Sequence, residues 1–226
     1  MTMTIENTAQ KHTVFLVDDH PLVREWLTNL IHEQADLAVC GEAEAGPPAL
    51  QAILRLKPDL AIVDIALKDS SGIELTKNLK ETCPQVAVLV LSMHEESHHA
   101  ERALRAGARG YIMKRESTRK VIFAIRQILG GKVYISEGLA AVMASQFLSC
   151  QTAAARSPVE QLSDRELEVF DLLGQGRGTR QTAEALHVSI KTVQAYCARI
   201  KEKLHLASSA ELVREAVRWR ERSNQV

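Results

Sequence analysis

The sequence contains only four cysteines in 226 residues, and no two of them form a C-x-x-C pair. Widely separated cysteines argue against a structural zinc site and against a disulfide framework, and they suit a reducing compartment. The chain also lacks any run of about 18 apolar residues, and its first ten residues are polar. These absences predict a soluble, cytoplasmic protein that does not associate with membranes.

An excess of charge of either sign is also missing, because 28 basic residues face 28 acidic ones. This balance excludes a protein that coats nucleic acid or membranes through its overall charge, although a local basic surface is compatible with it. The length exceeds that of one typical domain, and 46% hydrophobic residues are enough for more than one buried core. Two domains are therefore expected.

Short apolar runs alternate with helix-like segments over residues 12–131. The runs lie at 14–17, around 38–39, and at 60–63, 86–91 and 110–113. Strands that alternate with helices in this way predict an α/β domain with a doubly wound, five-stranded parallel sheet. Residues 1–11 are expected to form a flexible N-terminus ahead of this domain.

Polar side chains end four of these runs. Asp18 and Asp19 follow the first run, Asp64 the third, Ser92 the fourth and Lys114 the fifth. Because the carboxyl ends of parallel strands share one edge of the sheet, where ligands bind, these side chains are expected to meet. Each has a plainer explanation when it is taken singly. The acid pair, for example, could merely cap the helix that follows it.

As a group, these residues fit phosphoryl transfer. Carboxylates cluster against their mutual repulsion when a cation neutralises them, and Mg²⁺ prefers such oxygen ligands. Transfer to Asp64 needs a nucleophilic carboxylate, a metal that offsets the charge of acceptor and donor, and a fixed cation such as Lys114 for the phosphoryl oxygens. Ser92 can hydrogen-bond the phosphoryl group once it arrives and pull its loop inward. The pattern predicts a phospho-acceptor switch that uses Mg²⁺.

Residues 12–131 resemble the receiver domains of bacterial two-component response regulators. The resemblance is carried by the segments 14–24 (VFLVDDHPLVR), 58–65 (PDLAIVDI), 91–93 (LSM) and 106–114 (AGARGYIMK). It implies that Asp64 is the phospho-acceptor and that Lys114 binds the phosphoryl group. It also implies that Ser92 is the switch hydroxyl and Tyr111 the switch aromatic.

The same resemblance implies a metal site and a partner. Asp18, Asp19, Asp64 and the backbone carbonyl of Ala66 would hold Mg²⁺, and a sensor histidine kinase would donate the phosphoryl group. No enzymatic activity is expected beyond the chain's own phosphotransfer onto Asp64.

The pattern changes after Gly131. Residues 132–158 are expected to form a linker, in which Ser136 caps a helix that runs to about Leu148. Beyond the linker, helical spacing recurs at about 164–173, 179–186, 190–204 and 209–219. Two short helices joined by a tight turn predict a helix-turn-helix within a second, smaller all-α domain over 159–226.

This C-terminal part resembles the LuxR-type helix-turn-helix domain, so the whole chain resembles response regulators of the NarL/FixJ type. The matching segments are 162–169 (LSDRELEV), 192–196 (TVQAY), 200–204 (IKEKL) and 210–213 (AELV). Local charge agrees, because residues 177–205 contain six lysines and arginines but two acidic residues, a net charge of +4. The resemblance implies a phosphorylation-switched transcription factor that binds double-stranded DNA and forms a homodimer when active.

The helix expected at 190–204 would enter the major groove. Its candidate contacts to phosphates and base edges are Lys191, Thr192, Gln194, Ala195, Arg199, Lys201 and Lys203. Val193, Ile200 and Leu204 are expected to face the core. Gln194 and Tyr196 stand where the family commonly has lysine and histidine, so weaker phosphate attraction and more reliance on dimerisation are expected.

Two other functions remain open. The short side chains of Ala195 and Ala198, with Gln194, also fit a phosphorylation-dependent protein-interaction regulator whose helical domain does not bind DNA. The other alternative is a free-standing aspartyl phosphatase, although no general acid stands at short spacing from Asp64.

Thr182 is a further departure from the LuxR-type pattern, because an aliphatic residue usually packs the scaffold helix at this position. Its buried hydroxyl is expected to bond to a backbone carbonyl one turn earlier. Restoring an isoleucine at this position is expected to raise the midpoint of thermal unfolding.

Overall fold

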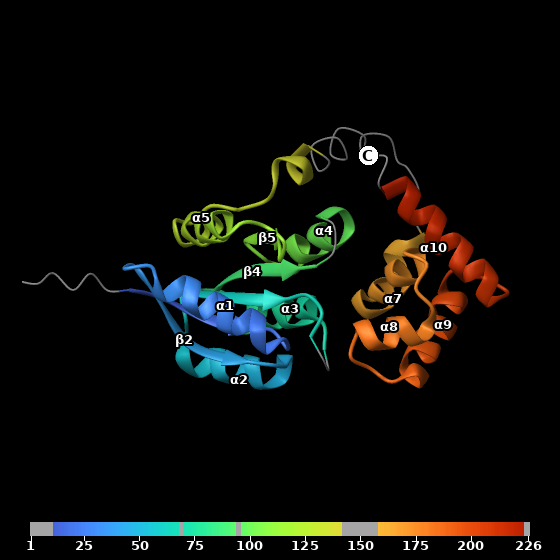
Figure 1. Cartoon of the computed structure of the whole chain (residues 1–226), viewed down its shortest axis with the longest axis horizontal. Helices are drawn as coiled ribbons and strands as arrows, with labels where there is room; N and C mark the ends of the chain where they lie inside the picture. Colours follow the sequence, from blue (N-terminus) through green and yellow to red (C-terminus); the bar gives the residue numbers. More distant parts are fainter. Residues whose placement is uncertain (1–10, 68–69, 94–95, 142–157, 224–226) are drawn as a thin grey trace, which may run out of the picture.

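The computed structural model describes residues 11–67, 70–93, 96–141 and 158–223 (Figure 1). Strands and helices alternate along its first part: β1 His12–Val17, α1 Pro21–His32, β2 Leu37–Ala43, α2 Gly46–Leu56, β3 Leu60–Asp64, α3 Gly72–Thr82, β4 Ala87–Ser92, α4 Glu96–Ala106, β5 Gly110–Met113 and α5 Thr118–Leu129. All neighbouring strands are parallel, in the order β2-β1-β3-β4-β5. The predicted doubly wound α/β fold is confirmed.

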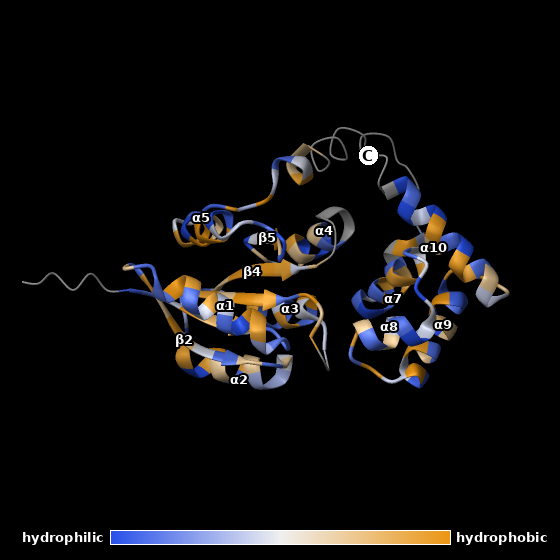
Figure 2. Ribbon diagram, viewed as in Figure 1, coloured by the Kyte–Doolittle hydropathy of each residue, from blue (hydrophilic) through white to orange (hydrophobic). Residues whose placement is uncertain are grey.

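Alternate residues of the central strands supply two separate cores, one on each face of the sheet. Ala61 and Val63 of β3 face the core shared with α2, α3 and α4. Leu60 and Ile62 face the core shared with α1 and α5. All five residues of β3 are buried, which explains why this strand reads as an unbroken apolar run that ends in a carboxylate. Figure 2 shows the apolar strands between the helices.

The start of the expected linker packs on the α/β domain. Tyr134 forms a parallel bridge with Gly110, its backbone N–H donates to the Arg109 carbonyl at 2.9 Å, and its carbonyl accepts from Tyr111 at 3.1 Å. The side chain of Leu139 is buried in the core shared with α2, α3 and α4. Residues 132–141 therefore belong to the α/β domain, because Tyr134 pairs with backbone groups at the exposed edge of β5.

The helix expected after Ser136 begins there, since the Leu139 N–H donates to Ser136 Oγ at 3.2 Å. Its course to Leu148, and the rest of the expected linker up to residue 157, lie outside the described residues.

The second part is helical throughout its described residues and contains the short 3₁₀ helix Pro158–Gln161 (η1), α7 Asp164–Gly174, α8 Thr179–Ala185, α9 Ile190–Lys203 and α10 Ser209–Ser223. Ser163 begins α7 with a capping box, in which its side chain and that of Glu166 each accept from the other's backbone N–H. Val193 and Ile200 are fully buried in the core of this domain, and Leu204 is partly buried against it, as expected. The predicted helix-turn-helix is α8, a tight turn and α9.

Thr182 is completely buried in α8, but its hydroxyl has no hydrogen-bond partner among the described residues. The prediction that this hydroxyl bonds to a backbone carbonyl one turn earlier is therefore wrong.

Among the described helices, none combines the length and the apolar character needed to cross a bilayer.

Candidate functional site

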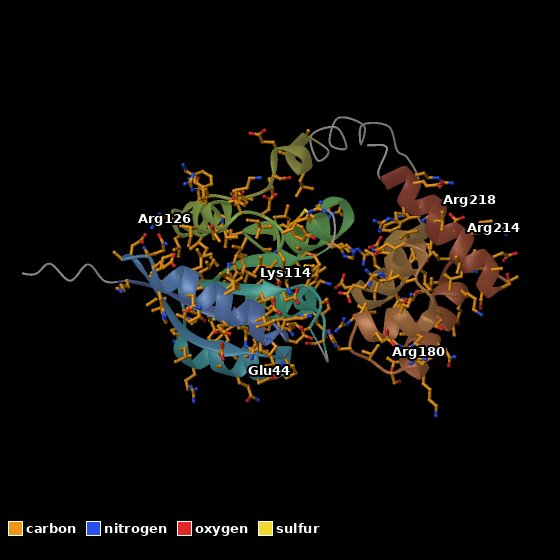
Figure 3. All side chains as sticks on the ribbon, viewed as in Figure 1. Glu44, Lys114, Arg126, Arg180, Arg214 and Arg218 are labelled. Carbon is orange, nitrogen blue, oxygen red and sulfur yellow. The ribbon has the colours of Figure 1, made fainter. Side chains whose placement is uncertain are left out.

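The carboxyl ends of the strands bring together the charged residues that the sequence singles out. Lys114 follows β5, and its Nζ lies 2.7 Å from Asp18 Oδ2 and 2.8 Å from Asp64 Oδ2. All three side chains are at most 6% exposed, and Lys114 is labelled on the α/β domain in Figure 3. We refer to Asp18, Asp19 and Asp64 as the acidic cluster. The predicted meeting of these residues is what the parallel sheet produces.

Burial and neighbouring charges shift the pKa values of Asp64 and Lys114. Removal from water raises the pKa of Asp64, the Lys114 ammonium lowers it and the Asp18 carboxylate raises it again, with a net result of about 6. Burial would lower the pKa of Lys114, but Asp64 and Asp18 outweigh that effect and raise it. Lys114 is therefore a fixed cation at neutral pH. Its single positive charge does not balance the negative charges of the carboxylates around it.

The acidic cluster has the donor set of a hard-cation site. One ligand atom from each of Asp18, Asp19, His20 and Asp64 lies within 4.8 Å of the others. Asp19 Oδ1 is buried and, although His20 Nδ1 lies 2.8 Å away, receives no hydrogen bond of good geometry from the described residues. Three carboxylates around one ammonium leave excess negative charge and spare oxygen donors, which suits a divalent cation that prefers oxygen. The described residues at this position therefore fit Mg²⁺.

The loop after Asp64 is shaped by small residues. Ala66 pairs with Ser71 across the turn, and the Gly72 N–H donates to the Ile65 carbonyl at 2.9 Å. A Cβ at Gly72 would collide with the backbone oxygen of Asp64, so only glycine allows α3 to start this close to the strand end.

Ser92 and Tyr111 lie on the neighbouring strands β4 and β5, on the side of the sheet next to Asp64. Asp64 is paired in register with Leu91, and the Lys114 N–H donates to the Ser92 carbonyl at 2.7 Å. Ser92 is fully buried, and Tyr111 is 1% exposed in the core that also contains α4. Tyr111 and Ser92 therefore lie between β3, which ends in Asp64, and the core to which α4 contributes; their switch roles stay a prediction.

Two residues near the acidic cluster were not singled out from the sequence. Arg24 of α1 is buried, and its Nη1 donates to the Asp18 carbonyl at 2.7 Å while its Nη2 donates to Glu44 at 2.9 Å. His20 Nδ1 lies 2.8 Å from Asp19 Oδ1 and 3.1 Å from Asp18 Oδ1. The sequence did indicate that Arg24 would be buried, because it stands three residues before Leu27 on the same buried face of α1.

The predicted DNA-contacting residues lie on α9 in two groups. Exposed side chains on successive turns of the helix are Lys191, Gln194, Ala195, Ala198 and Arg199. We refer to these five as the recognition face. The guanidinium of Arg199 lies 5.9 Å from the ring centroid of Tyr196, a distance at which a cation–π interaction forms.

The other predicted contacts have roles within the domain. Thr192 Oγ1 lies 2.8 Å from the Oγ of Ser189, the residue that caps α9. Lys203 Nζ donates to Glu166 Oε2 at 2.6 Å, so it neutralises a buried acid of α7. Lys201 is half-buried on the same helix. Contacts from these three residues to DNA stay a prediction.

Comparisons with known families divide the chain in the same way as its fold. Residues 14–126 match the family described as the response regulator receiver domain. Residues 160–216 match the family described as bacterial regulatory proteins of the luxR family.

Individual relatives share both parts. The oxygen regulatory protein NreC of Staphylococcus aureus is 33% identical over 209 residues, which cover 91% of this chain and 96% of NreC. A two-component response regulator of the LuxR family from Aurantimonas sp. SI85-9A1 is 32% identical with a TM-score of 0.58, over 62% of this chain and 99% of that one. RcsB of Salmonella enterica serovar Typhimurium, solved bound to a promoter in the presence of the phosphomimetic BeF₃⁻, has the same fold. It is 22% identical with a TM-score of 0.57, over 91% of this chain and 97% of RcsB.

Proposed function

This chain belongs to the response regulators that join a receiver domain to a LuxR-type DNA-binding domain, and we propose that phosphorylation of Asp64 by a sensor histidine kinase switches its control of transcription. The observation that carries the proposal is the buried contact of Lys114 with Asp64 and Asp18 at 2.8 and 2.7 Å. This contact places the nucleophilic carboxylate of Asp64 beside the fixed cation of Lys114. The carboxylates around Lys114 outnumber it, so they leave negative charge for a metal ion.

Each residue of the site has a distinct task in this proposal. Asp64 Oδ attacks the phosphorus of the donor, and the kinase histidine leaves with the bonding electron pair. Lys114 remains near the phosphoryl oxygens and offsets their charge. Asp18, Asp19, Asp64 and the Ala66 carbonyl would hold Mg²⁺, which supplies charge neutralisation when bound. Ser92 donates a hydrogen bond to the new phosphoryl group and thereby repositions the start of α4.

The output is proposed to be sequence-specific binding to double-stranded DNA by a homodimer. The recognition face offers Lys191 and Arg199 for phosphates or guanine, Gln194 for adenine, and the methyl groups of two alanines for thymine. RcsB, which shares the fold, has been solved as dimers on DNA. Few cations on this face make binding by a single copy weak, so two copies are needed for useful affinity.

The proposal is tested by selecting bound fragments from a random DNA pool with and without BeF₃⁻ and Mg²⁺, using wild type and Asp64→Ala. The expected result is an enriched inverted repeat that depends both on the phosphoryl mimic and on Asp64. Equal enrichment by Asp64→Ala would overturn the role of that residue. A folded protein that enriches no sequence would instead favour the alternative in which the helical domain binds a protein.

A further inference from the structure

Asp18 and Asp19 are successive residues whose carboxylates belong to the same site. Successive side chains of an extended strand point to opposite faces of the sheet, yet ligand atoms of these two carboxylates lie within 4.8 Å of each other. The backbone makes this possible because β1 ends at Val17 and the chain bends at Asp19. The orientation of the peptide group that joins Asp18 to Asp19 therefore decides whether both carboxylates can face one ion.

This peptide group is held by the guanidinium of Arg24. Arg24 Nη1 donates to the carbonyl of Asp18 at 2.7 Å, in a buried hydrogen bond. On its other side, the Asp18 N–H donates to the carbonyl of Ala43, the last residue of β2, at 3.1 Å. Both backbone polar groups of Asp18 are therefore fixed, one by α1 and the other by β2.

The carboxylate of Asp18 is held in two directions as well. Its Oδ1 accepts from the backbone N–H of His20 at 2.9 Å, at the start of α1. Its Oδ2 lies 2.7 Å from Lys114 Nζ. A rotation of the peptide after Asp18 would carry the carboxylate away from these partners, so the bond from Arg24 also fixes the position of the side chain.

Two glutamates at the end of β2 keep the guanidinium of Arg24 in place. Nη2 donates to Glu44 Oε1 at 2.9 Å, and Nε lies 3.4 Å from Glu42 Oε2. Because the guanidinium is planar and its donors form a fixed fork, these two contacts set the direction in which Nη1 points. The glutamate side chains are 54% and 65% exposed, so the ion pairs themselves contribute little to stability.

Arg24 occupies a position where α1 otherwise buries aliphatic side chains. The other buried residues of this helix are Leu27, Leu30 and Ile31. A buried cation is weak evidence of stabilisation, since an apolar side chain of similar volume often serves a fold as well or better. An apolar side chain cannot donate to the Asp18 carbonyl, and this bond is the contribution that requires arginine.

We propose that Arg24 is a positioning residue of the acidic cluster and that, by holding the peptide between Asp18 and Asp19, it makes the site selective for Mg²⁺ over the larger Ca²⁺. The inference rests on the proposed binding of Mg²⁺ at this cluster. Mg²⁺ demands near-ideal octahedral geometry, whereas Ca²⁺ accepts irregular sets of oxygen ligands. Carboxylates whose directions are fixed therefore favour the smaller ion.

Orientation and charge predict effects of opposite sign when Arg24 is removed. The guanidinium is a cation, so its loss alone would strengthen the binding of any metal ion by the neighbouring carboxylates. Loss of orientation weakens binding, and it weakens the binding of Mg²⁺ more than that of Ca²⁺. Groups that orient metal ligands typically change metal affinity by about 10- to 100-fold.

The test measures the Kd of the full-length chain for Mg²⁺ and for Ca²⁺ by calorimetric titration at constant ionic strength. Arg24→Met, which keeps the length of the side chain without its donors, should weaken Mg²⁺ binding by about tenfold or more and Ca²⁺ binding by a smaller factor. Arg24→Lys restores a charged donor and should recover part of the Mg²⁺ affinity. The Mg²⁺ concentration for half-maximal phosphorylation by phosphoramidate should rise by the same factor as the Kd.

Two control variants separate the carbonyl bond from the other contacts of the arginine. Glu42→Gln combined with Glu44→Gln removes the ion pairs but leaves the donor, so both affinities should fall by the same factor and the selectivity should stay. Arg126→Met breaks a two-bond pair with Asp36, at 2.9 and 2.8 Å, beyond the opposite end of β2. Its affinities for both metals should equal those of wild type.

The result that overturns the inference is an Arg24→Met variant whose two affinities are unchanged or change by the same factor. Phosphorylation of wild type on Asp64 in that case would leave the proposed function intact. A wild-type chain that binds no Mg²⁺ would overturn the metal site and the role of Arg24 together.

Discussion

The receiver and the output domain both bury carboxylates, but they neutralise them in different ways. In the output domain each buried acid has a cation of its own: Glu166 with Lys203 at 2.6 Å, Glu168 with Arg165 at 2.6 Å and Asp171 with Arg220 at 2.8 Å. In the receiver the buried Asp18 and Asp64 share the ammonium of Lys114. Among the described residues, the basic partner within 4 Å of Asp19 is the imidazole of His20.

The pKa values reflect this difference. Burial by itself would raise the pKa of Glu166, but hydrogen bonds from Lys203 and Ser163 outweigh it, and the pKa falls below its ordinary value of 4.5. Burial dominates at Asp64, whose pKa rises to about 6. Folding therefore favours the ionised form of Glu166 and disfavours the ionised form of Asp64. Strongly raised pKa values of this second kind are common at functional sites.

Breaking a matched pair should produce the largest loss of stability. Lys203→Met leaves Glu166, whose side chain is 4% exposed, without its cation. The expected cost is about 2–3 kcal/mol, somewhat below the cost for a fully buried pair because Lys203 is itself partly exposed. Unfolding is followed by the fluorescence of Trp219 in a Trp26→Phe background, so that only the core of the output domain is observed.

The double variant Lys203→Met with Glu166→Gln should recover most of that loss, and Lys201→Met, two residues earlier on α9, should lose little. Because the pKa of Glu166 is lowered by folding, its contribution is present at pH 7 and disappears as the pH falls below about 4.5. A penalty in Lys203→Met that is unchanged at pH 3 would contradict the electrostatic explanation.

Removing one acid from the unmatched cluster should have the opposite effect. Folding raises the pKa of Asp64 from 3.8 to about 6, so its ionisation opposes folding above pH 6 and does so less as the pH falls toward 4. Asp64→Asn should therefore stabilise the protein at pH 7 by up to about 3 kcal/mol, from about 1.4 kcal/mol per pKa unit. Calorimetry at pH 7 and pH 4.5 without Mg²⁺ should show a gain that shrinks at the lower pH.

Saturating Mg²⁺ provides the control for that experiment. It should raise the melting temperature of wild type more than that of Asp64→Asn, since a ligand of the folded state stabilises in proportion to its affinity. If Asp64→Asn melts at a lower temperature than wild type without Mg²⁺, the ionised Asp64 carboxylate does not destabilise the folded protein, and the prediction is wrong.

The hydroxyl of Thr182 is a buried polar group of the output domain that has no hydrogen-bond partner among the described residues. Thr182→Val removes the hydroxyl with little change in shape, and Thr182→Ile adds a methylene as well. We expect Thr182→Val to stabilise the domain by about 1 kcal/mol, the cost of a buried unsatisfied group, and to raise the unfolding midpoint measured through Trp219. Destabilisation by valine as well as isoleucine would show that the site requires the hydroxyl.

The smallest effect is expected where an exposed cation is held by an aromatic ring and not by an acid. Stacking on Tyr196 orders Arg199 without neutralising it, so its charge stays available for DNA. Tyr196→Leu should weaken binding to the selected DNA by about two- to fivefold, from about 0.5–1 kcal/mol, while Tyr196→Phe keeps the affinity. Fluorescence anisotropy measures both, and an equal loss in the two variants would assign the effect to the tyrosine hydroxyl.

Much of the site could be predicted from the sequence because strand ends are local features. The apolar runs and the polar residue after each one place Asp18, Asp64 and Lys114 at one sheet edge before any coordinates are known. The same applies to α9, whose capping serine and spacing of Val193 and Ile200 define its buried face. The sequence did not predict that Arg24 and His20 would contact the site, because side chains near a helix start commonly cap the helix or face solvent.

The sequence by itself determined the elements, their order and the chemistry that each strand end offers, because these depend on periodicity and on residues close together in the chain. Only the tertiary structure decided which cation neutralises which acid. Lys203 turns to Glu166 and away from the recognition face, and residues 132–141 pack on the receiver. The contact of Arg165 with the loop after Asp64 also depends on folding, because it joins groups 95 or more residues apart whose separation no local pattern encodes.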